Sequence, residues 1–148
     1  MNIENITAGF QLIGTRIAKL TIDNEFTSID VNDESVTREI DVSYDVSPVF
    51  TVNGLMAQNI MMYIRLKISN GEFHTFINLD LEGCYIFDGK DKEQLYEMIT
   101  INGTATLYSI ARGMISSITS HMCTNGTLIL PMINMFKLRD GINKQDNK

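Results

Sequence analysis

The chain has 148 residues, of which 44% are hydrophobic and 20% charged, and its 18 acidic against 12 basic side chains give a formal net charge of -6. This length and balance are typical of a single globular domain and exclude wholesale disorder. An acidic chain without a Lys/Arg cluster repels phosphate backbones, so we expect no nucleic-acid partner. The first residues lack the features of a secretory signal, and no apolar run nears the roughly 20 residues of a membrane helix. We therefore expect a cytoplasmic protein without membrane insertion.

The first third of the chain predicts two strands joined by a long connection. Residues 10–22 carry apolar side chains on both faces of an extended chain, which predicts a strand covered on both faces. Residues 23–38 are polar and irregular, and we interpret them as a mobile loop. Residues 39–46 predict a strand with one wet face, because apolar residues alternate there with polar ones; the apolar set is Ile40, Val42, Tyr44 and Val46.

The next segment, residues 47–59, is the crossover. Pro48 cannot donate to a sheet and Gly54 permits a bend, so we expect irregular backbone. The crossover is nevertheless apolar, and an apolar loop is expected to be buried or to bind something.

A β-hairpin is the clearest local signal of the sequence. Residues 60–68 and 73–81 both alternate apolar and polar side chains, and Asn70-Gly71 between them predicts a two-residue turn. The second arm continues to Phe87, and Gly83 within it is a candidate bulge.

After the hairpin the apolar spacing becomes helical. Asp91 predicts the cap of a helix over residues 92–100, and Thr104 after Asn102-Gly103 predicts the cap of a second helix that ends at Asn125-Gly126. Its predicted apolar face consists of Tyr108, Ala111, Ile115, Ile118 and Met122. Residues 127–136 are read as extended, and the tail 137–148 as frayed and disordered.

Strands followed by helices predict one α+β domain over residues 1–148: a four-stranded antiparallel sheet followed by two helices packed on one face. Chemistry-bearing residues are few. His74 is expected at the surface, and His121 with Cys123 lacks the ligand spacing of a zinc site. Asp80 and Glu82 are interpreted as solvated strand acids, and Cys84 with Cys123 as free thiols. We therefore predict no enzyme activity, no catalytic residues, no cofactor and no metal.

Four stretches of the second half carry a resemblance to a known family. They are Gly83-Cys84-Tyr85, Leu107-Tyr108-Ser109-Ile110-Ala111-Arg112, Ile115-Ser116-Ser117-Ile118-Thr119 and Leu128-Ile129-Leu130-Pro131-Met132-Ile133-Asn134-Met135. In this order and spacing the chain resembles the SecB-like protein-export chaperones, as a diverged member. Ser109 and Met132 stand where the family has proline, and Asn78 stands where it has an acidic spot for docking the export motor. The resemblance therefore does not extend to that docking, and a role in export or in protecting an antitoxin stays open.

The resemblance implies an ATP-independent holdase, a homotetramer built as a dimer of dimers, which holds unfolded polypeptides in apolar grooves. The crossover would form one groove wall, and the second helix with the extended segment after it another. Flexible methionines in both segments suit such a surface. The predicted groove residues are Tyr44, Val46, Val49, Phe50, Val52, Leu55, Met56, Met61, Leu128, Leu130, Met132 and Met135.

An alternative from another class is a hot-dog or cystatin-like small-ligand-binding module or thioesterase, in which a sheet wraps a helix around one enclosed pocket. Such folds place the long helix before or within the strands, whereas here the predicted helices follow them.

Overall fold

The computed structural model describes residues 9–122 and 127–146. Its sheet is formed by β1 (Phe10–Asn24), β2 (Thr37–Val46), β3 (Phe50–Val52), β4 (Leu55–Ser69) and β5 (His74–Phe87), and its helices are α1 (Lys92–Met98), η2 (Ile99–Gly103), α2 (Thr104–Met122) and α3 (Met135–Asp146). Strand order is β1-β5-β4-β2, all antiparallel, and β3 pairs with β4 beyond the end of β2. The predicted α+β class is confirmed, with a short extra strand and a third helix.

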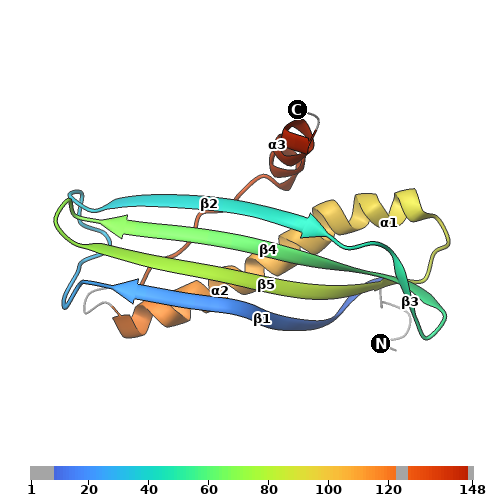
Figure 1. Ribbon diagram of the computed structural model, residues 1–148, viewed down its shortest axis with the longest axis horizontal. Coiled ribbons are helices and arrows are strands. Elements are labelled where there is room, and N and C mark those ends of the chain that lie inside the picture. The colour runs from blue at the N-terminus through green and yellow to red at the C-terminus, as the bar shows by residue number, and fades with distance from the viewer. Residues whose placement is uncertain (1–8, 123–126, 147–148) are drawn as a thin grey trace, which may run out of the picture.

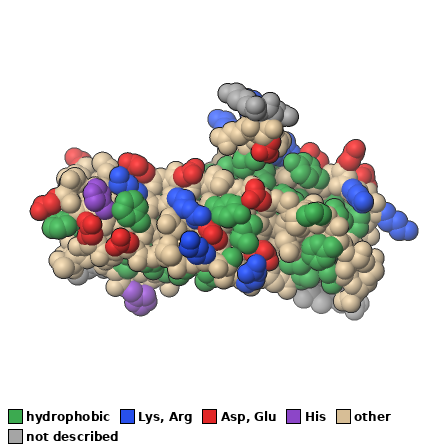
Figure 2. Space-filling view, viewed as in Figure 1, with side chains coloured by type: hydrophobic (Ala, Val, Ile, Leu, Met, Phe, Trp, Pro, Cys, Tyr) green, Lys and Arg blue, Asp and Glu red, His purple; other side chains and the backbone are tan. Residues whose placement is uncertain are grey.

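One face of the sheet carries the core, and α2 packs across it (Figure 1). Apolar residues of β4 and β5 alternate inward toward the helices, and the largest contributions come from Ile60, Met62, Ile64, Leu66, Ile77, Leu79, Leu81 and Tyr85. The other face, here the open face, has no helix over it among the described residues. In Figure 2, basic and acidic side chains lie beside hydrophobic ones on the surface in view. The burial of β2 confirms the predicted one-sided alternation of residues 39–46, because its apolar side chains are buried or half-buried and its acidic ones are exposed.

β1 is only partly as predicted. Its strand is confirmed, but in the single chain its apolar side chains are uncovered: Ile13, Ile17, Leu20 and Ile22 are 37% to 49% exposed. The register shifts of the sheet also lie in β1, between Leu12 and Gly14 and between Ile17 and Lys19. The bulge predicted at Gly83 is therefore wrong. Gly83 is small for another reason, because a Cβ there would lie 3.1 Å from Leu107 Cδ1 of α2.

The connection from β1 to β2 was predicted to be polar and mobile, and this is wrong for its apolar members. Phe26, Ile29 and Val31 are buried in the core, and the ring of Phe26 meets Phe73 edge-on at 6.2 Å. Asn24 fixes the start of the connection, since its Oδ1 accepts from the Phe26 amide at 3.1 Å.

Two of the four Asn-Gly pairs of the sequence differ from prediction. Asn53 and Gly54, in the crossover read as irregular, both have positive φ, 50° and 80°, and join β3 to β4 as a two-residue turn. Asn70-Gly71 instead belongs to a four-residue loop between paired Ser69 and His74. There Asn70 Oδ1 accepts from the amide of Phe73 at 2.8 Å, and this side-chain contact replaces the tight turn.

α1, η2 and α2 form one continuous helical rod, in which the π-helical turn η2 separates the short α1 from the long α2. Asp91 caps α1 as predicted, accepting from the Glu93 amide at 2.9 Å. Thr104 does not cap a new helix: its hydroxyl donates to the carbonyl of Thr100 at 2.7 Å inside the rod. Tyr85 supports the π turn by donating to the Gly103 carbonyl at 2.6 Å. The predicted end at Asn125-Gly126, like Cys123, lies outside the described residues.

The C-terminal tail was predicted to be frayed, and the structure shows a helix, α3, over Met135–Asp146 instead. Asn134 caps it by accepting from the Lys137 amide at 3.2 Å, and Leu138 and Ile142 pack against the core at helical spacing. None of the helices in the described part of the chain is long and apolar enough to cross a membrane.

Candidate polypeptide-binding surface

The late apolar segment, residues 127–134, is clamped along α2 by four side chains of that helix. Thr119 Oγ1 accepts from the Leu128 amide at 2.9 Å, Ser116 donates to the Leu128 carbonyl at 3.2 Å, Arg112 Nε donates to the Leu130 carbonyl at 2.9 Å, and Tyr108 donates to the Pro131 carbonyl at 2.7 Å. Burial raises the pKa of the Tyr108 hydroxyl, which keeps it a neutral donor. The clamp fixes which side of the segment faces the core.

Alternation along this segment divides its predicted groove residues. Leu128, Leu130 and Met135 are buried within the single chain, with Leu130 fully enclosed. Met132 is 86% exposed, and Ile129 and Phe136 are also open. Met132 borders a small hollow of about 90 Å³ with Tyr108 and Arg112. Of the four residues predicted here, only Met132 offers surface to a partner.

The crossover keeps more of its apolar surface open. Phe50 is 38% exposed, and Val49, Val52, Leu55 and Met56 are half-buried. Ser47 ties the base of the crossover to β4, because its amide donates to the Asn59 carbonyl at 2.9 Å and its carbonyl accepts from Gln58 Nε2 at 2.9 Å. Phe50 pairs with Ala57, which in turn pairs with Ile86, so the crossover extends the open face with an apolar end. Half-buried Met61 also lies on that face, opposite Asp45.

Beside β2 the surface is hollowed by two clefts that share a wall, α3. One, of about 340 Å³, is lined by Asp41, Val42 and Ser43 on one side and by Leu138, Gly141 and Ile142 among the residues of α3. The other, of about 380 Å³, lies between Tyr44, Asp45 and Val46 of β2, Tyr96 of α1, and Ile142, Asn143 and Asp146 of α3. The walls opposite β2 in these clefts are thus α1 and α3.

Two of the predicted residues, Tyr44 and Val46, line the second cleft. Tyr44 is largely covered, and this burial raises the pKa of its hydroxyl to about 12. Tyr96, Leu138 and Ile142 also line the clefts but were not among the predicted groove residues. The signal for the last two was the apolar spacing Met135, Leu138, Ile142 in an otherwise polar tail.

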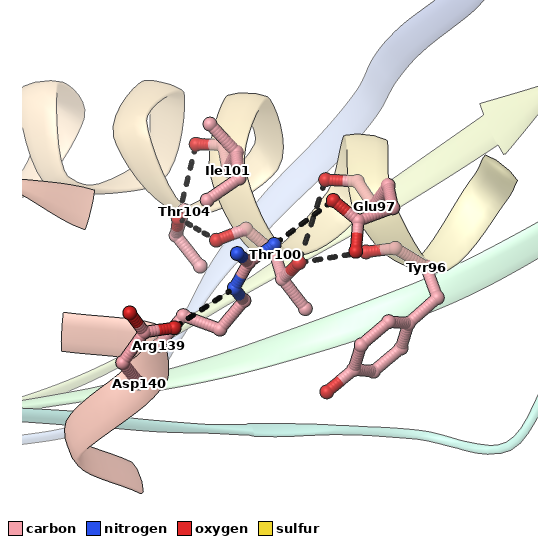
Figure 3. Close-up of polar contacts among 7 residues, drawn as sticks. All are labelled: Tyr96, Glu97, Thr100, Ile101, Thr104, Arg139 and Asp140. Carbon is pink, nitrogen blue, oxygen red and sulfur yellow. Dashed lines mark hydrogen bonds and ion pairs between the residues drawn. The ribbon is translucent and has the colours of Figure 1, made fainter. Parts of the chain in front are cut away.

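α3 is held beside the clefts by packing of its apolar side chains against the core and by one ion pair with α1, which Figure 3 shows. Arg139 Nη1 lies 2.9 Å from Glu97 Oε2 of α1, and Arg139 Nε lies 3.6 Å from Asp140 Oδ1. The guanidinium also stands 5.7 Å from the centre of the exposed Phe136 ring. Because Glu97 is largely exposed, this is a weak and salt-sensitive fastening.

The remaining reactive side chains of the described residues are spread over the open face and the end of α2. His74 is half-buried on the open face against Phe76, with ring centres 6.0 Å apart, and His121 is exposed near the end of α2. Cys84 is a free thiol whose pKa is raised by burial and by Glu82. Asp80 and Glu82 are ion-paired, with Arg65 and Arg16 respectively. Within the described ranges, no group of three or more His, Cys, Asp or Glu side chains could hold a metal ion.

Long antiparallel strands, with helices on one face and two clefts of mixed polarity beside the edge strand β2, define an α+β protein. The fold is SecB-like: the structure is similar to the SecB-like chaperone Rv1957 of Mycobacterium tuberculosis, solved in complex with a ChAD peptide from the antitoxin HigA1 (Rv1956). The TM-score is 0.66 at 14% sequence identity, over 84% of this chain and 91% of the other. No protein-family model and no curated protein sequence matches the chain.

Proposed function

We propose that this protein is an ATP-independent chaperone that holds non-native polypeptide segments on its apolar surface. The observation that carries the proposal is the open apolar surface at the β2 end of a SecB-like fold: Phe50 and its half-buried neighbours of the crossover on the open face, and the Tyr44/Tyr96 cleft on the helix-facing side of β2. A monomeric protein that needed these side chains only for its core would enclose them. The resemblance of the fold to a peptide-bound chaperone supports this role.

Holding a client tightly requires more than one such surface. Burying one large apolar side chain is worth roughly 1.5 to 3 kcal/mol, so four anchors give about 6 to 12 kcal/mol against association costs of about 4 to 15 kcal/mol. Several surfaces in one assembly raise the effective concentration and close this gap. We therefore propose self-association into a homotetramer, a dimer of dimers, with the uncovered apolar strand β1 as part of the contact between copies.

Of the two roles that the resemblance leaves open, guarding a particular peptide is better supported than export. Asn78 lies on the open face between Arg65 of β4 and Thr21 of β1 in the sheet register. The neutral side chain of Asn78 offers no charge to a basic docking partner. We propose that the clients are cytoplasmic polypeptides, an antitoxin-like peptide among them, and that no catalysis or cofactor takes part.

The test is aggregation of a chemically denatured model enzyme diluted into buffer without ATP. Light scattering should fall progressively as the protein is added, and be suppressed at a few-fold molar excess. Undiminished aggregation at that excess contradicts the proposal.

A further inference from the structure

β2 is a terminal strand of the sheet with two unlike faces. In the order β1-β5-β4-β2 no strand of the described chain pairs with its outer edge. Toward the helices it presents Ile40, Val42, Tyr44 and Val46, and toward the open face Glu39, Asp41, Ser43 and Asp45. An edge of this kind is a template for a further strand.

The backbone phase of β2 decides which residues a further strand would meet. The Ser47 amide donates to the Asn59 carbonyl of β4, so the odd-numbered residues of β2 turn their peptide groups toward β4. Peptide groups alternate in direction along a strand, and the even-numbered residues therefore turn theirs outward. The outward groups thus belong to the apolar positions, Val42, Tyr44 and Val46 among them.

Space along this edge is already present in part. The two clefts beside β2 together follow residues 41–46, and Ile142 of α3 is common to both linings. A strand of six residues spans about 20 Å. α3 therefore crosses the edge of β2 between the two clefts. Displacing this one helix would join the clefts into a single binding site along the edge.

The charges of β2 indicate which sequences would bind along this edge. Glu39 and Asp41 make no ion pair within the described residues, and Asp45 receives only the Tyr63 hydroxyl, at 3.0 Å. Arg65, the cation opposite Asp41, lies 2.7 Å from Asp80 instead. A strand beside β2 thus meets uncompensated acids on one face and half-buried apolar side chains on the other. Opposite charges across a strand pair are favourable and like charges are not.

We propose that an extended client segment with alternating apolar and basic residues adds to the outer edge of β2 as an antiparallel strand, displacing α3. The inference rests on the proposed chaperone function and deepens it. It assigns client binding to main-chain hydrogen bonds and client selectivity to the alternating side-chain pattern. A second copy of β2 is a poorer occupant, since it would place Glu39, Asp41 and Asp45 against the same acids. Main-chain bonds supply affinity for many sequences, and the alternating face supplies selectivity.

Backbone N-methylation of a peptide ligand tests these main-chain hydrogen bonds, while the full protein chain is left unmodified. In an antiparallel pair, the client residues opposite Val42 and Tyr44 are its apolar ones, so their amides face β2. The probe is an end-capped seven-residue peptide in which lysine alternates with valine or tyrosine, measured by fluorescence anisotropy. Methylation of two apolar-position amides should weaken binding at least tenfold, and methylation of two lysine amides less than threefold. A version with glutamate for lysine should also bind at least tenfold more weakly.

Each other outcome has a defined meaning. Equal effects of the two methylations overturn strand addition, and a loss confined to the lysine-methylated peptide overturns the antiparallel geometry. Equal binding of the glutamate version overturns the charge selection. If the peptide lowers the mass of the protein in light scattering, β2 pairs with a second copy and the proposal is wrong. Absent peptide binding with intact suppression of aggregation refutes strand addition alone, whereas loss of both refutes the chaperone function.

Discussion

The two edges of the sheet, β1 and β2, are the most instructive contrast in this molecule. β1 exposes four large apolar side chains, whereas β2 is acidic on one face and lies under α3. Uncovered apolar edges aggregate unless they are paired, so β1 fits a permanent contact between copies. A charged edge with a weakly fastened cover fits an occupant that comes and goes. One sheet can thus separate assembly from client binding.

The largest expected effect is the loss of assembly when β1 is charged. Leu20→Lys places an ammonium group among Ile17 and Ile22 on the helix-facing side of β1. We expect the solution mass to fall from that of four chains of 16.7 kDa each to that of two or fewer, and suppression of aggregation to weaken at least tenfold, because the separate surfaces no longer act together. Multi-angle light scattering checks the mass.

Thr21→Lys is the matched control, since the adjacent side chain points to the open face of the same strand. It should leave the mass unchanged. Equal dissociation by both variants, or by neither, contradicts the assignment of this edge to assembly.

A smaller effect is expected beyond the end of β2, in the crossover. Phe50→Ser removes an exposed ring from the apolar end of the open face and should weaken binding of an unfolded model protein about tenfold, with little change in melting temperature. Phe76→Ser is the control, because Phe76 is equally exposed, 41% against 38%, but lies beside Lys67 and His74 at the far end of the same face. If both variants bind alike, the crossover has no special part in holding clients.

Loosening α3 should change binding in the opposite direction. Arg139→Gln removes the ion pair with Glu97 and should raise the affinity for the alternating peptide by about threefold at low salt, because less work is needed to clear the β2 edge. The difference in affinity between Arg139→Gln and the wild type should shrink as salt is added to both, since salt screens the Arg139–Glu97 contact of the wild type. Lys144→Gln, further along α3, is the control and should leave affinity unchanged. Weaker binding by Arg139→Gln would mean that α3 contributes to the binding site and does not block it.

The smallest effect concerns the pH dependence of stability. Burial holds the pKa of Tyr44 at about 12 in the folded chain, above the ordinary value of about 10. The neutral hydroxyl therefore contributes stability that is complete below pH 10 and is lost as the pH rises toward 12. In urea unfolding, the difference in stability between Tyr44→Phe and wild type should shift in favour of the variant over this range. A constant difference contradicts the burial of Tyr44 beneath the second cleft.

The sequence predicts the parts of the fold that follow a strict period. The strands 39–46 and 60–87 alternate, and the helical rod has apolar residues at helical spacing, so their positions and faces could be read directly. Local signals were less decisive, because they depend on tertiary competition. Asn53-Gly54 forms the tight turn since β3 and β4 pair on both sides of it, whereas Asn70 satisfies the amide of Phe73 with its own side chain.

The candidate site was harder to predict than the fold. Apolar content alone does not distinguish Leu130, sealed under the clamp from α2, from Met132, which the same backbone turns outward. α3 was missed because only two apolar residues, Leu138 and Ile142, interrupt the polar tail after residue 136, and their contribution depends on a β2 edge distant in sequence. The acidic face of β2 could be predicted from the alternation of residues 39–46. That Glu39 and Asp41 make no ion pair within the described residues could not.

Hydrogen–deuterium exchange of the wild-type chain, with and without a permanently unfolded model protein, tests the division between the two edges most directly. The account predicts slower exchange across residues 38–56, covering β2 and the crossover, and faster exchange in α3 as it is displaced. Protection confined to β1, or no change at residues 38–56 while the client is bound, would contradict it.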